Sequence, residues 1–450
     1  MLTVAYLANE LPCAVEPYVM EEIGELRKRG VRVIAASVWR PHMRGGEVGD
    51  GDPQLVLQRL RPIVLASAAL LCVRGWARLA PLMKRILYRG REGFVQRLKA
   101  LAHTVLGVCY AALLKERGVE HIHVHHGYFG SWIAMTAARL LGVEFSMTLH
   151  GSDLLMHGAY LDTKLAHCAF CLTISEYNRN YILRRYPGVD PRKVLVGRMG
   201  VDVGDEVHPP GLPQRSAGDS FNILTVGRLH AVKDQAFLVR ACSELAARGV
   251  HFKCDIAGEG PERKRLERLI SSCGLSRQVR LLGYTAREET NALYYRADLM
   301  VITSRSEGIP LVLMEAMARG KIVLAPAITG IPELVVAGET GFLYQPGSMH
   351  DFVEQVLWIQ SLSRKADRHC CSPPVDSLGR IGCAAQEQVR QKFNGRINLE
   401  RFAETFIERV RPGSERRAHE NPVLQQVQLS LQRDRSLPVS ADGIDAVAGP

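Results

Sequence analysis

The chain has 450 residues, of which 47% are hydrophobic, and its formal net charge is +11. Because ordinary domains run to about 100–200 residues, this length predicts two α/β domains plus a tail, and the apolar fraction excludes a globally disordered chain. The positive charge favours anionic ligands or an anionic membrane surface as partners. The sequence has no zinc finger, no aromatic ribonucleoprotein motif and no dense Lys/Arg run, so we expect no nucleic acid partner.

The cysteines and the first residues both indicate the cellular compartment of the protein. The eleven cysteines are scattered and odd in number, which in a long chain is typical of free thiols in a reducing environment. Cys168 and Cys171 form a C-x-x-C pair without a second pair at zinc-ligand spacing. The opening run Leu2–Ala8 is typical of a core strand rather than a signal peptide. We therefore expect a cytoplasmic protein, with the inner face of the membrane as a peripheral location.

Short apolar runs alternate with helical patterns along the chain, which predicts parallel sheets built from βαβ units. The strands expected in the first half are Leu2–Ala8, Val31–Ser37, His121–His126, Phe145–His150, Cys171–Ile174 and Val194–Val196.

Residues 54–118 differ from the rest because they are both apolar and basic. From Arg59 to Arg117 the sequence has twelve Lys and Arg residues against two Glu. Basic helices with an apolar face can lie in a membrane interface. A solvated basic helix pair that covers the first sheet explains the composition equally well, because the sequence does not tell which face is apolar.

Residues 206–220 lack a periodic pattern and are rich in Pro and Gly, which predicts a linker. We expect it to join two Rossmann-like domains, residues 1–205 and 221–385. Ligands of open α/β sheets bind at the carboxyl ends of the strands. Two such domains that face each other with these ends would enclose a cleft. The strands expected in the second domain are Asn222–Val226, Phe252–Ala257, Val279–Leu282, Leu299–Thr303, Ile322–Ala325 and Gly341–Tyr344.

The end of the chain changes character. Residues 361–383 look like an irregular insertion, and residues 386–410 are expected to form a closing helix. The polar residues 411–450, with weak periodicity, predict a disordered tail.

Two loops of the second domain carry candidate chemistry. The first expected strand runs into Gly227 and Arg228, and Lys233 follows five residues later. Arg offers a planar fork and Lys a mobile point charge, two complementary contacts for a pyrophosphate. The second loop follows Leu299–Thr303 and contains Glu307 and Gly308; Pro310 then occupies the first-turn position of a helix. Free backbone N–H groups at such a helix start attract phosphate.

The motifs resemble those of the retaining glycosyltransferases of GT-B fold, glycosyltransferase family four. They are V-G-R-L-x-x-x-K-D from Val226, I-A-G-E-G-P-E from Ile256, Glu307-x7-Glu315, and T-G-I-P-E-L-V with G-E-T-G-F-L-Y from Thr329. These enzymes use nucleotide-diphosphate sugars without a metal. The resemblance implies that Arg228 and Lys233 bind the donor diphosphate, that Glu307 contacts the transferred sugar and that Glu315 binds the ribose. Gly227, Gly308, Ile309 and Leu311 would complete the donor site.

The first half resembles the colanic-acid type of exopolysaccharide glycosyltransferase, in the segments Pro12–Val19, His123–His126 and Ser146–Asp153. In the wider family the His of the H-G-x-D segment touches the donor sugar, which makes His150 a candidate catalytic residue. Three positions depart from the common pattern. Asn9–Pro12 replace a Gly-Gly loop near the donor phosphates, Tyr18 replaces a Phe, and Thr329-Gly330 replace a Gly-Gly pair.

The histidine cluster suggests a metal, since His121, His123 and His125 would share one face of a strand. No carboxylate or cysteine near them in the sequence completes a ligand set, so we expect no metal. His125, His126 and Glu16 are instead expected on the acceptor side.

The expected function is transfer of a hexose from a nucleotide-diphosphate sugar to a hydroxyl of a glycan or lipid-linked glycan in polysaccharide biosynthesis, with retention and through an oxocarbenium-like transition state. The alternatives are a nucleotide-sugar epimerase, a non-catalytic protein of the same fold, and a transferase with a small soluble acceptor.

Overall fold

The computed structural model describes residues 1–13, 16–39, 55–57, 62–90, 92–156, 158–204, 220–366 and 377–411. Contacts group residues 1–403 into one unit and residues 404–450 into a second. Most of the expected linker 206–220 and of the expected tail 411–450 lies outside the described residues, and so does the middle of the expected insertion 361–383.

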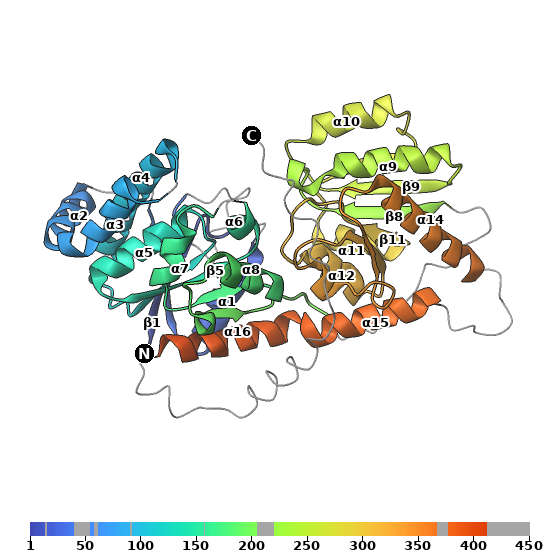
Figure 1. The fold of residues 1–450 in the computed structure, drawn as a ribbon. Helices are drawn as coiled ribbons and strands as arrows, with labels where there is room; N and C mark the ends of the chain where they lie inside the picture. The colour runs from blue at the N-terminus through green and yellow to red at the C-terminus, as the bar shows by residue number, and fades with distance from the viewer. Residues whose placement is uncertain are drawn as a thin grey trace. The chain divides into compact units, whose positions relative to one another are not determined.

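The first unit contains two sheets in which all strand pairs are parallel (Figure 1). The first sheet has the strand order β3-β2-β1-β4-β5-β6-β7 and the second has the order β10-β9-β8-β11-β12-β13. The strands of the first sheet are β1 Thr3–Ala8, β2 Arg32–Ser37, β3 Leu55–Val56, β4 His121–His125, β5 Glu144–Leu149, β6 Cys171–Thr173 and β7 Val194–Val196. Those of the second are β8 Phe221–Val226, β9 Phe252–Ala257, β10 Val279–Gly283, β11 Leu299–Val301, β12 Ile322–Pro326 and β13 Phe342–Tyr344.

Helices connect the strands. In the first half they are α1 Pro17–Lys28, α2 Pro62–Arg74, α3 Trp76–Tyr88, α4 Phe94–Leu114, α5 Phe129–Leu141, α6 Ser152–Leu155, α7 Leu161–His167 and α8 Glu176–Arg185. In the second half they are α9 Gln235–Ala247, α10 Arg263–Ser272, α11 Arg287–Arg296, α12 Leu311–Ala318, α13 Ile331–Leu334, α14 Met349–Ala366, α15 Ser377–Lys392 and α16 Gly395–Val410. Two 3₁₀ turns, Pro191–Lys193 and Ala231–Lys233, complete the described elements.

The α/β class and the predicted strands are confirmed, with ends that differ by at most two residues. The short edge strand β3 was not predicted, because Leu55–Val56 is too short to give a periodic signal. The single helix expected over 386–410 is two helices, α15 and α16, interrupted at Phe393 and Asn394. The helix after Glu307 begins at Leu311, so Pro310 is its N-cap rather than its first residue.

The strand orders place the loops of interest. Each sheet reverses its direction of growth at one pair of neighbours, β1 and β4 in the first sheet and β8 and β11 in the second. At such a point the two flanking connections leave on opposite faces of the sheet, which opens a crevice at the carboxyl ends of the strands. His125 ends β4 and His126 follows it, Gly227 and Arg228 follow β8, and Glu307 lies in the loop after β11.

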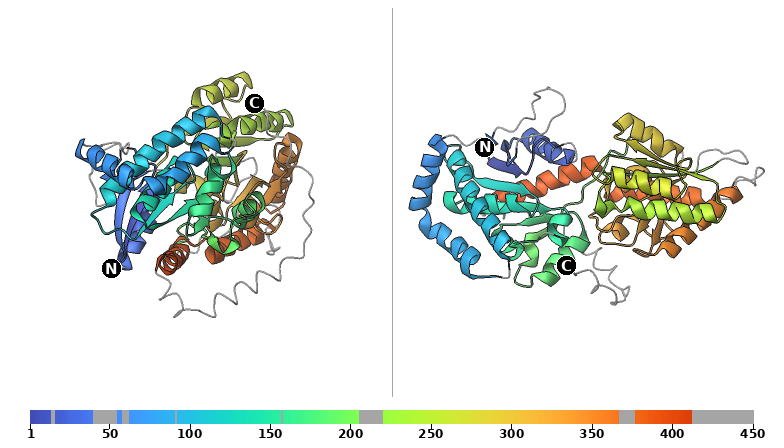
Figure 2. Two further views of the ribbon diagram at one scale, coloured as in Figure 1. Left: turned by 60° about the vertical axis from the view of Figure 1, so that its left-hand side comes forward. Right: turned by 90° about the horizontal axis from the view of Figure 1, so that it is seen from above.

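The basic segment forms α2, α3 and α4; α3 and α4 pack on α5, and α2 packs on α4 (Figures 1 and 2). By length and composition α4 could cross a membrane, but it packs tightly on α5: a Cβ atom at Gly107 would lie 2.6 Å from Thr136 Cβ, and Trp132 Nε1 donates to Thr104 Oγ1 at 2.9 Å. These contacts bury one face of α4 against α5, while Phe94, Val95, Leu98 and Val105 stay exposed.

Candidate functional site

The loop after β8 rests on the loop after β9. A Cβ atom at Gly258 would lie 2.0 Å from the carbonyl oxygen of Gly227, and one at Gly260 would lie 2.2 Å from that of Leu229. Both glycines have a positive φ, 142° and 158°, which L side chains rarely adopt. The I-A-G-E-G motif is therefore explained by a close backbone contact that holds the Gly227–Leu229 loop. Arg228 extends from this loop and is exposed.

Lys233 and Glu307 come together although 74 residues separate them. Lys233 Nζ lies 2.6 Å from Glu307 Oε1 in an ion pair whose side chains are 29% and 10% exposed. Ser304 Oγ donates to the same carboxylate oxygen at 2.6 Å, and Thr303 Oγ1 donates to the carbonyl oxygen of Lys233 at 3.0 Å. The two loops that the sequence singled out thus form one hydrogen-bonded cluster at the carboxyl edge of the second sheet.

The T-G-I-P-E motif supports the Glu307 loop from the other side. Thr329 has a φ of 46°, a conformation that strains a β-branched residue and explains why glycine suits this position. Here the Thr329 hydroxyl donates to the carbonyl oxygen of Glu307 at 2.6 Å, which offsets the strain. A Cβ atom at Gly330 would lie 2.7 Å from the Gly308 carbonyl oxygen, so the second glycine of the pair is sterically required.

Gly308 also meets the loop that carries His150. A Cβ atom at Gly308 would lie 2.4 Å from the His150 carbonyl oxygen and 2.4 Å from the side chain of Ile174. A Cβ atom at Gly151 would lie 3.3 Å from the Gly308 nitrogen. The backbones of the H-G-x-D and Glu-Gly segments therefore approach each other as only glycines permit. Ile309 is buried and Leu311 half-buried, and both flank the start of α12.

Glu315 lies on α12 with a partner that the sequence did not reveal. Tyr294 Oη on α11 donates to Glu315 Oε2 at 2.8 Å. Burial, together with the negative charge of Glu315, raises the pKa of Tyr294 well above its usual value, so the phenol remains a donor. This hydrogen bond orients one carboxylate oxygen of Glu315. The Glu315 side chain is half-buried.

In the first sheet a buried carboxylate organises the loops after β4 and β5. Asp153 Oδ1 accepts from the backbone N–H groups of His150 and Gly151 at 3.1 and 2.8 Å. Its Oδ2 accepts from the N–H of Gly127 at 2.8 Å and lies 3.6 Å from His126 Nδ1. The last residue of the H-G-x-D motif is therefore a positioning group for His150, not a group exposed to a ligand.

His126 holds a charge next to this carboxylate. Burial by itself would lower the pKa of His126, but the nearby carboxylate of Asp153 and the hydrogen-bonded carboxylate of Glu16 raise it to about 10. Burial would likewise raise the pKa of Asp153, yet His126 and the backbone donors hold it well below its usual range. Glu16 Oε1 lies 2.9 Å from His126 Nε2. The three residues form a buried cation between two anions.

His150 is uncharged, in contrast to His126. Burial, together with the charge of His126, lowers its pKa well below the usual value, so the imidazole is neutral at neutral pH. His150 Nε2 lies 3.0 Å from His125 Nδ1, and the ring lies 5.0 Å from that of Tyr18. Its Nδ1 has no hydrogen-bond partner within the described part of the chain, which leaves one ring nitrogen available to a ligand.

The expectation that no carboxylate completes the histidine cluster is wrong. Glu22, His123 and His125 bring ligand atoms within 4.8 Å of one another, because α1 packs Glu22 against the first sheet. His125 Nε2 lies 2.9 Å from Glu22 Oε2 and 2.9 Å from Tyr6 Oη. His123, however, has both ring nitrogens within hydrogen-bond distance of hydroxyls, Ser146 Oγ at 2.8 Å and Thr148 Oγ1 at 3.1 Å. The absence of a metal stays a prediction.

Glu22 carried a signal in the sequence. The buried residues of α1 are Val19, Glu22, Ile23 and Leu26, at spacings of three, four and seven residues. This is the apolar stripe of a helix that packs on a core, and a glutamate within it implies a buried partner. Tyr6 and Tyr294 had no such signal, because each lies in an ordinary apolar or mixed stretch.

Two family models match the chain. Residues 15–205 match "Glycosyltransferase Family 4", and residues 213–370 match "Glycosyl transferases group 1". The chain belongs to the glycosyltransferases.

The relatives of this glycosyltransferase include proteins named for exopolysaccharide synthesis. WcaL of Salmonella typhimurium, named for colanic acid biosynthesis, is 32% identical over 217 residues, 46% of this chain and 49% of WcaL. The amylovoran biosynthesis glycosyltransferase AmsK of Erwinia amylovora is 26% identical over 326 residues, 68% of this chain and 74% of AmsK. The chain thus spans about half the length of WcaL.

The fold of the glycosyltransferase matches solved structures over nearly its whole length. HepE of Anabaena, described in complex with UDP-glucose, superposes with a TM-score of 0.60 at 18% identity, covering 90% of this chain and 99% of HepE. At this identity the likeness concerns the fold, which is that of the GT-B glycosyltransferases.

Proposed function

We propose that this glycosyltransferase moves a hexose from a nucleotide-diphosphate sugar to a hydroxyl of a glycan or lipid-linked glycan in polysaccharide biosynthesis, with retention of configuration. The observation that carries the proposal is the cluster of Lys233 and Glu307, 2.6 Å apart beside Gly308, with the exposed Arg228 on the adjoining loop. A mobile cation, a second cation with a planar fork and a carboxylate are the groups that a charged sugar donor needs.

The donor diphosphate would lie against Arg228 and Lys233. Arg228 has no ion-pair partner among the described residues, and the Lys233 ammonium is partly exposed. An incoming phosphate would share Lys233 with Glu307 and thereby free the carboxylate for the sugar hydroxyls. Charge that develops on the leaving diphosphate would be stabilised by cations already in place, which is usually the largest contribution to catalysis of this kind.

The sugar and the ribose would occupy the two ends of this cluster. The neutral His150 would offer its Nδ1 to a hydroxyl of the transferred hexose. Glu315, oriented by Tyr294, would accept hydrogen bonds from the ribose. Gly227, Ile309 and Leu311 would supply backbone contacts, and Gly308 would admit the sugar close to the backbone.

In the chemical step the bond between the anomeric carbon and the diphosphate oxygen breaks, and the acceptor oxygen bonds to the same face of that carbon. The acceptor proton passes to the departing phosphate oxygen. The transition state resembles an oxocarbenium ion. The protein would contribute positioning and charge stabilisation rather than a nucleophile, and Arg228 with Lys233 would take the place of a metal ion. His125, His126 and Glu16 would border the acceptor.

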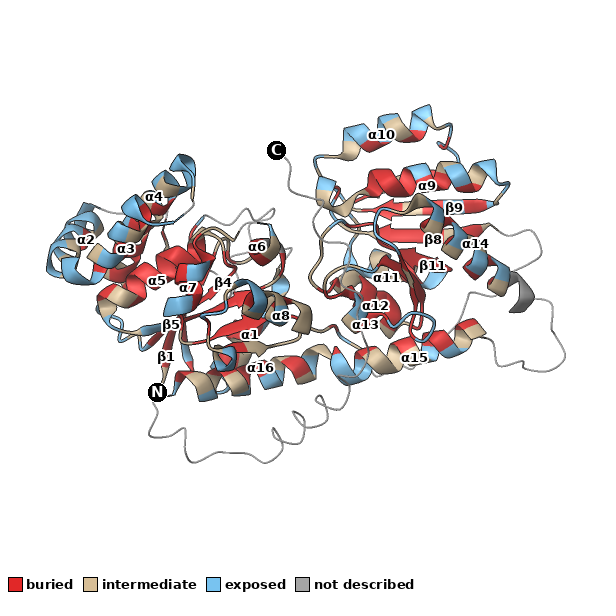
Figure 3. Cartoon of the chain, in the orientation of Figure 1, coloured by how far each residue is buried: buried red, intermediate tan, exposed pale blue. Residues whose placement is uncertain are grey.

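A peripheral location at the cytoplasmic face of an anionic membrane is part of the proposal. Much of α2, α3 and α4 is exposed (Figure 3). Their exposed apolar side chains include Ile63, Val73, Tyr88, Phe94 and Val95, each more than 60% exposed. Part of the basic excess is structural, because Arg78, Arg85 and Arg97 donate to backbone carbonyls. Arg74, Lys84 and Lys99 remain at the surface, where they suit anionic headgroups.

A screen of labelled nucleotide sugars against the purified chain tests the proposal. We expect one donor to be hydrolysed slowly, or transferred when a membrane extract supplies the acceptor, and a chelator to leave the rate unchanged. An epimerase would convert the donor without acceptor, and a non-catalytic protein would show no calorimetric binding of UDP or GDP. Either result would refute the transferase proposal. Loss of the rate with the chelator would refute only metal independence.

A further inference from the structure

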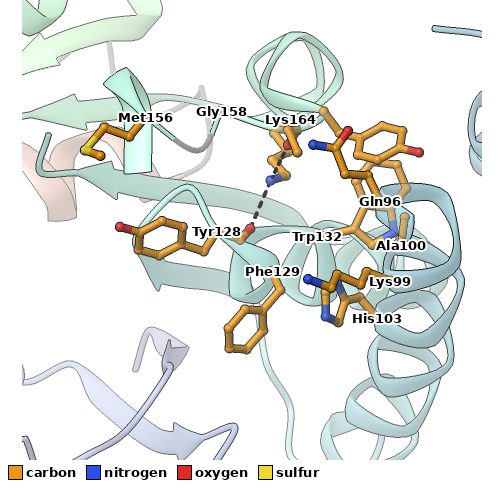
Figure 4. A pocket seen from close by; sticks show the side chains of 12 residues that line it. Gln96, Lys99, Ala100, His103, Tyr128, Phe129, Trp132, Met156, Gly158 and Lys164 are labelled. Atoms are coloured by element: carbon orange, nitrogen blue, oxygen red, sulfur yellow. Dashed lines mark hydrogen bonds between the residues drawn. The ribbon is translucent and has the colours of Figure 1, made fainter. Parts of the chain in front are cut away.

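A cavity of about 340 Å³ opens in the first half of the chain, apart from the donor cluster (Figure 4). It lies between α4, the start of α5 and the segment that joins α6 to α7. Lys99 and His103 contribute from α4, Tyr128 and Phe129 from the start of α5, and Met156 and Tyr160 from the joining segment. Its size is at the lower end of the range for small-molecule sites.

The walls combine aromatic rings with a few polar atoms. The His103 and Phe129 rings stack at 5.1 Å, and Tyr128 and Phe129 are only half-buried. Tyr160 is 4% exposed, and its hydroxyl has no hydrogen-bond partner among the residues that the structure describes. This hydroxyl exposes no surface to the cavity. The aromatic rings, together with Lys99 and His103, suit a ligand that is itself part ring and part polar.

The cavity is lined by two lysines, Lys99 and Lys164, and by no acidic residue. Lys164 donates to the carbonyl oxygens of Gly127, Tyr128 and Ala159 at 2.7, 2.9 and 2.9 Å. Burial lowers the pKa of Lys164 to about 7, so this amine carries only part of a positive charge at neutral pH. Lys99 is exposed, so an anion at the mouth would meet a positive charge and no carboxylate of the lining.

The cavity borders the residues expected at the acceptor. The ring of Tyr128 stacks on that of His126 at 5.7 Å, and the His126 ring lies 4.7 Å from that of His150. A ligand in the cavity would thus be separated from the H-G-x-D loop by one or two side chains.

Helix α4 also offers an apolar surface beside the cavity. At 100° per residue, positions 94, 98 and 105 lie on one side of the helix and positions 96, 100 and 103 on the opposite side, and positions 95 and 99 lie in that order between them. Phe94, Leu98 and Val105 are 80%, 57% and 60% exposed, whereas Ala100 and His103 face the cavity. Val95, which is 61% exposed, continues the apolar strip round the helix toward Lys99, and Lys99 lines the cavity mouth.

We propose that this cavity binds the phosphate-bearing saccharide head of an amphiphilic acceptor, with the hydrocarbon chain on the exposed strip of Phe94, Leu98 and Val105. The inference rests on the proposed transferase function, because it names the site of the lipid-linked acceptor. Lys99 would contact the phosphate at the mouth, and Tyr128 and Phe129 would pack on the saccharide ring.

The test is equilibrium binding of dodecyl phosphate, below its micelle concentration, to the full chain. Inorganic phosphate is the probe without a chain. Lys99→Glu reverses the charge at the mouth, and Lys115→Glu makes the same change at an exposed position at the end of α4, away from the cavity. Met156→Trp narrows the mouth from a side chain that is 53% exposed, so it should fold normally. Thermal melting and UDP binding are measured for every variant.

We expect dodecyl phosphate to bind at least about 10-fold more tightly than inorganic phosphate, since the chain and the charge both contribute. Lys99→Glu and Met156→Trp should weaken dodecyl phosphate binding by about 10-fold, with Lys115→Glu unchanged. Equal losses in the two lysine variants, or unchanged binding in Met156→Trp, would overturn the proposal. UDP binding reports on the proposed function separately: its absence in the wild type would remove the transferase, while the dodecyl phosphate results would still judge the cavity.

Discussion

The polar groups at the carboxyl edge of the first sheet are buried and paired, whereas the cations at the carboxyl edge of the second sheet are partly or fully exposed. At the first edge Tyr6, His125 and Asp153 are fully buried, and their polar atoms are paired within the protein. At the second edge Arg228 is exposed and Lys233 shares its charge with a single carboxylate. The difference indicates two tasks. The first edge is a rigid support that presents one neutral imidazole, and the second keeps its cations available for a ligand.

Removal of the buried charge at the first edge should have the largest effect. In Asp153→Asn one of the two acceptor oxygens becomes an amide that cannot accept from the N–H groups of Gly127 or Gly151, and His126 loses a counter-charge. Breaking a buried pair costs about 3–5 kcal/mol, so we expect the free energy of unfolding, measured in urea, to fall by that amount. Asp162→Asn, whose side chain is 54% exposed, is the matched control and should change it by about 0–1 kcal/mol. Similar losses in both variants would mean that Asp153 is no special support.

At the second edge a substitution should separate activity from stability. Lys233→Ala removes one cation from the leaving diphosphate, and we expect turnover of the identified donor to fall by about 10²–10³-fold. The melting temperature should stay close to that of the wild type, because the Lys233–Glu307 pair is partly exposed. Lys264→Ala, at an exposed position on α10, controls for the loss of one positive charge. Undiminished transfer by Lys233→Ala would remove this residue from the donor site.

The two edges also differ in how far the sequence predicted them. Lys233, Glu307 and Glu315 were singled out because their segments follow a family pattern in which each motif is local. The strands were found because buried parallel strands form continuous apolar runs between turns. At the first edge, Tyr6 contacts His125 across 119 residues and Glu22 contacts it across 103, and no local pattern encodes such a pair.

The histidines illustrate the physical limit. His126 and His150 were both named as candidates, but the protonation of each follows from its burial and from the charged groups next to it. Packing gives His126 two carboxylates and a raised pKa, while it leaves His150 beside that cation with a lowered one. The composition of the sequence and the spacing of its histidines predict neither the raised pKa of His126 nor the lowered pKa of His150. The role of Thr329 was hidden for the same reason, since its strain and its hydrogen bond exist only in the folded loop.

A smaller effect is expected when the backbone contact between Gly258 and Gly227, next to Arg228, is disturbed. A Cβ atom at Gly258 would meet the Gly227 carbonyl oxygen at 2.0 Å, while one at Gly274 would meet nothing within 4 Å. Both residues have a positive φ, so the two alanine substitutions share the strain of that conformation, about 1 kcal/mol. Gly258→Ala should cost about 1–3 kcal/mol and weaken UDP binding, because the loop must move. Identical stabilities and UDP affinities for the two variants would show that the contact holds nothing in place.

The last comparison uses the pH dependence of the first edge. The pKa of His126 is about 10 in the folded chain and 6.5 as its ordinary value, so the folded state holds the proton more tightly. This stabilisation is complete below pH 6.5 and is lost as the pH rises through 10, with a slope of at most about 1.4 kcal/mol per pH unit. In His126→Gln that slope should disappear, because the amide does not titrate.

The measurement is urea unfolding of wild type and His126→Gln at several pH values between 6 and 10. Lys164, whose pKa burial lowers to about 7, changes stability in the opposite sense over this range, so a wild-type curve by itself would mix two slopes. The difference between the two proteins isolates His126, and it should shrink as the pH rises. If the free energies of unfolding of the two proteins change in parallel with pH, His126 carries no extra proton in the folded chain. The contrast between a charged His126 and a neutral His150 would then be wrong.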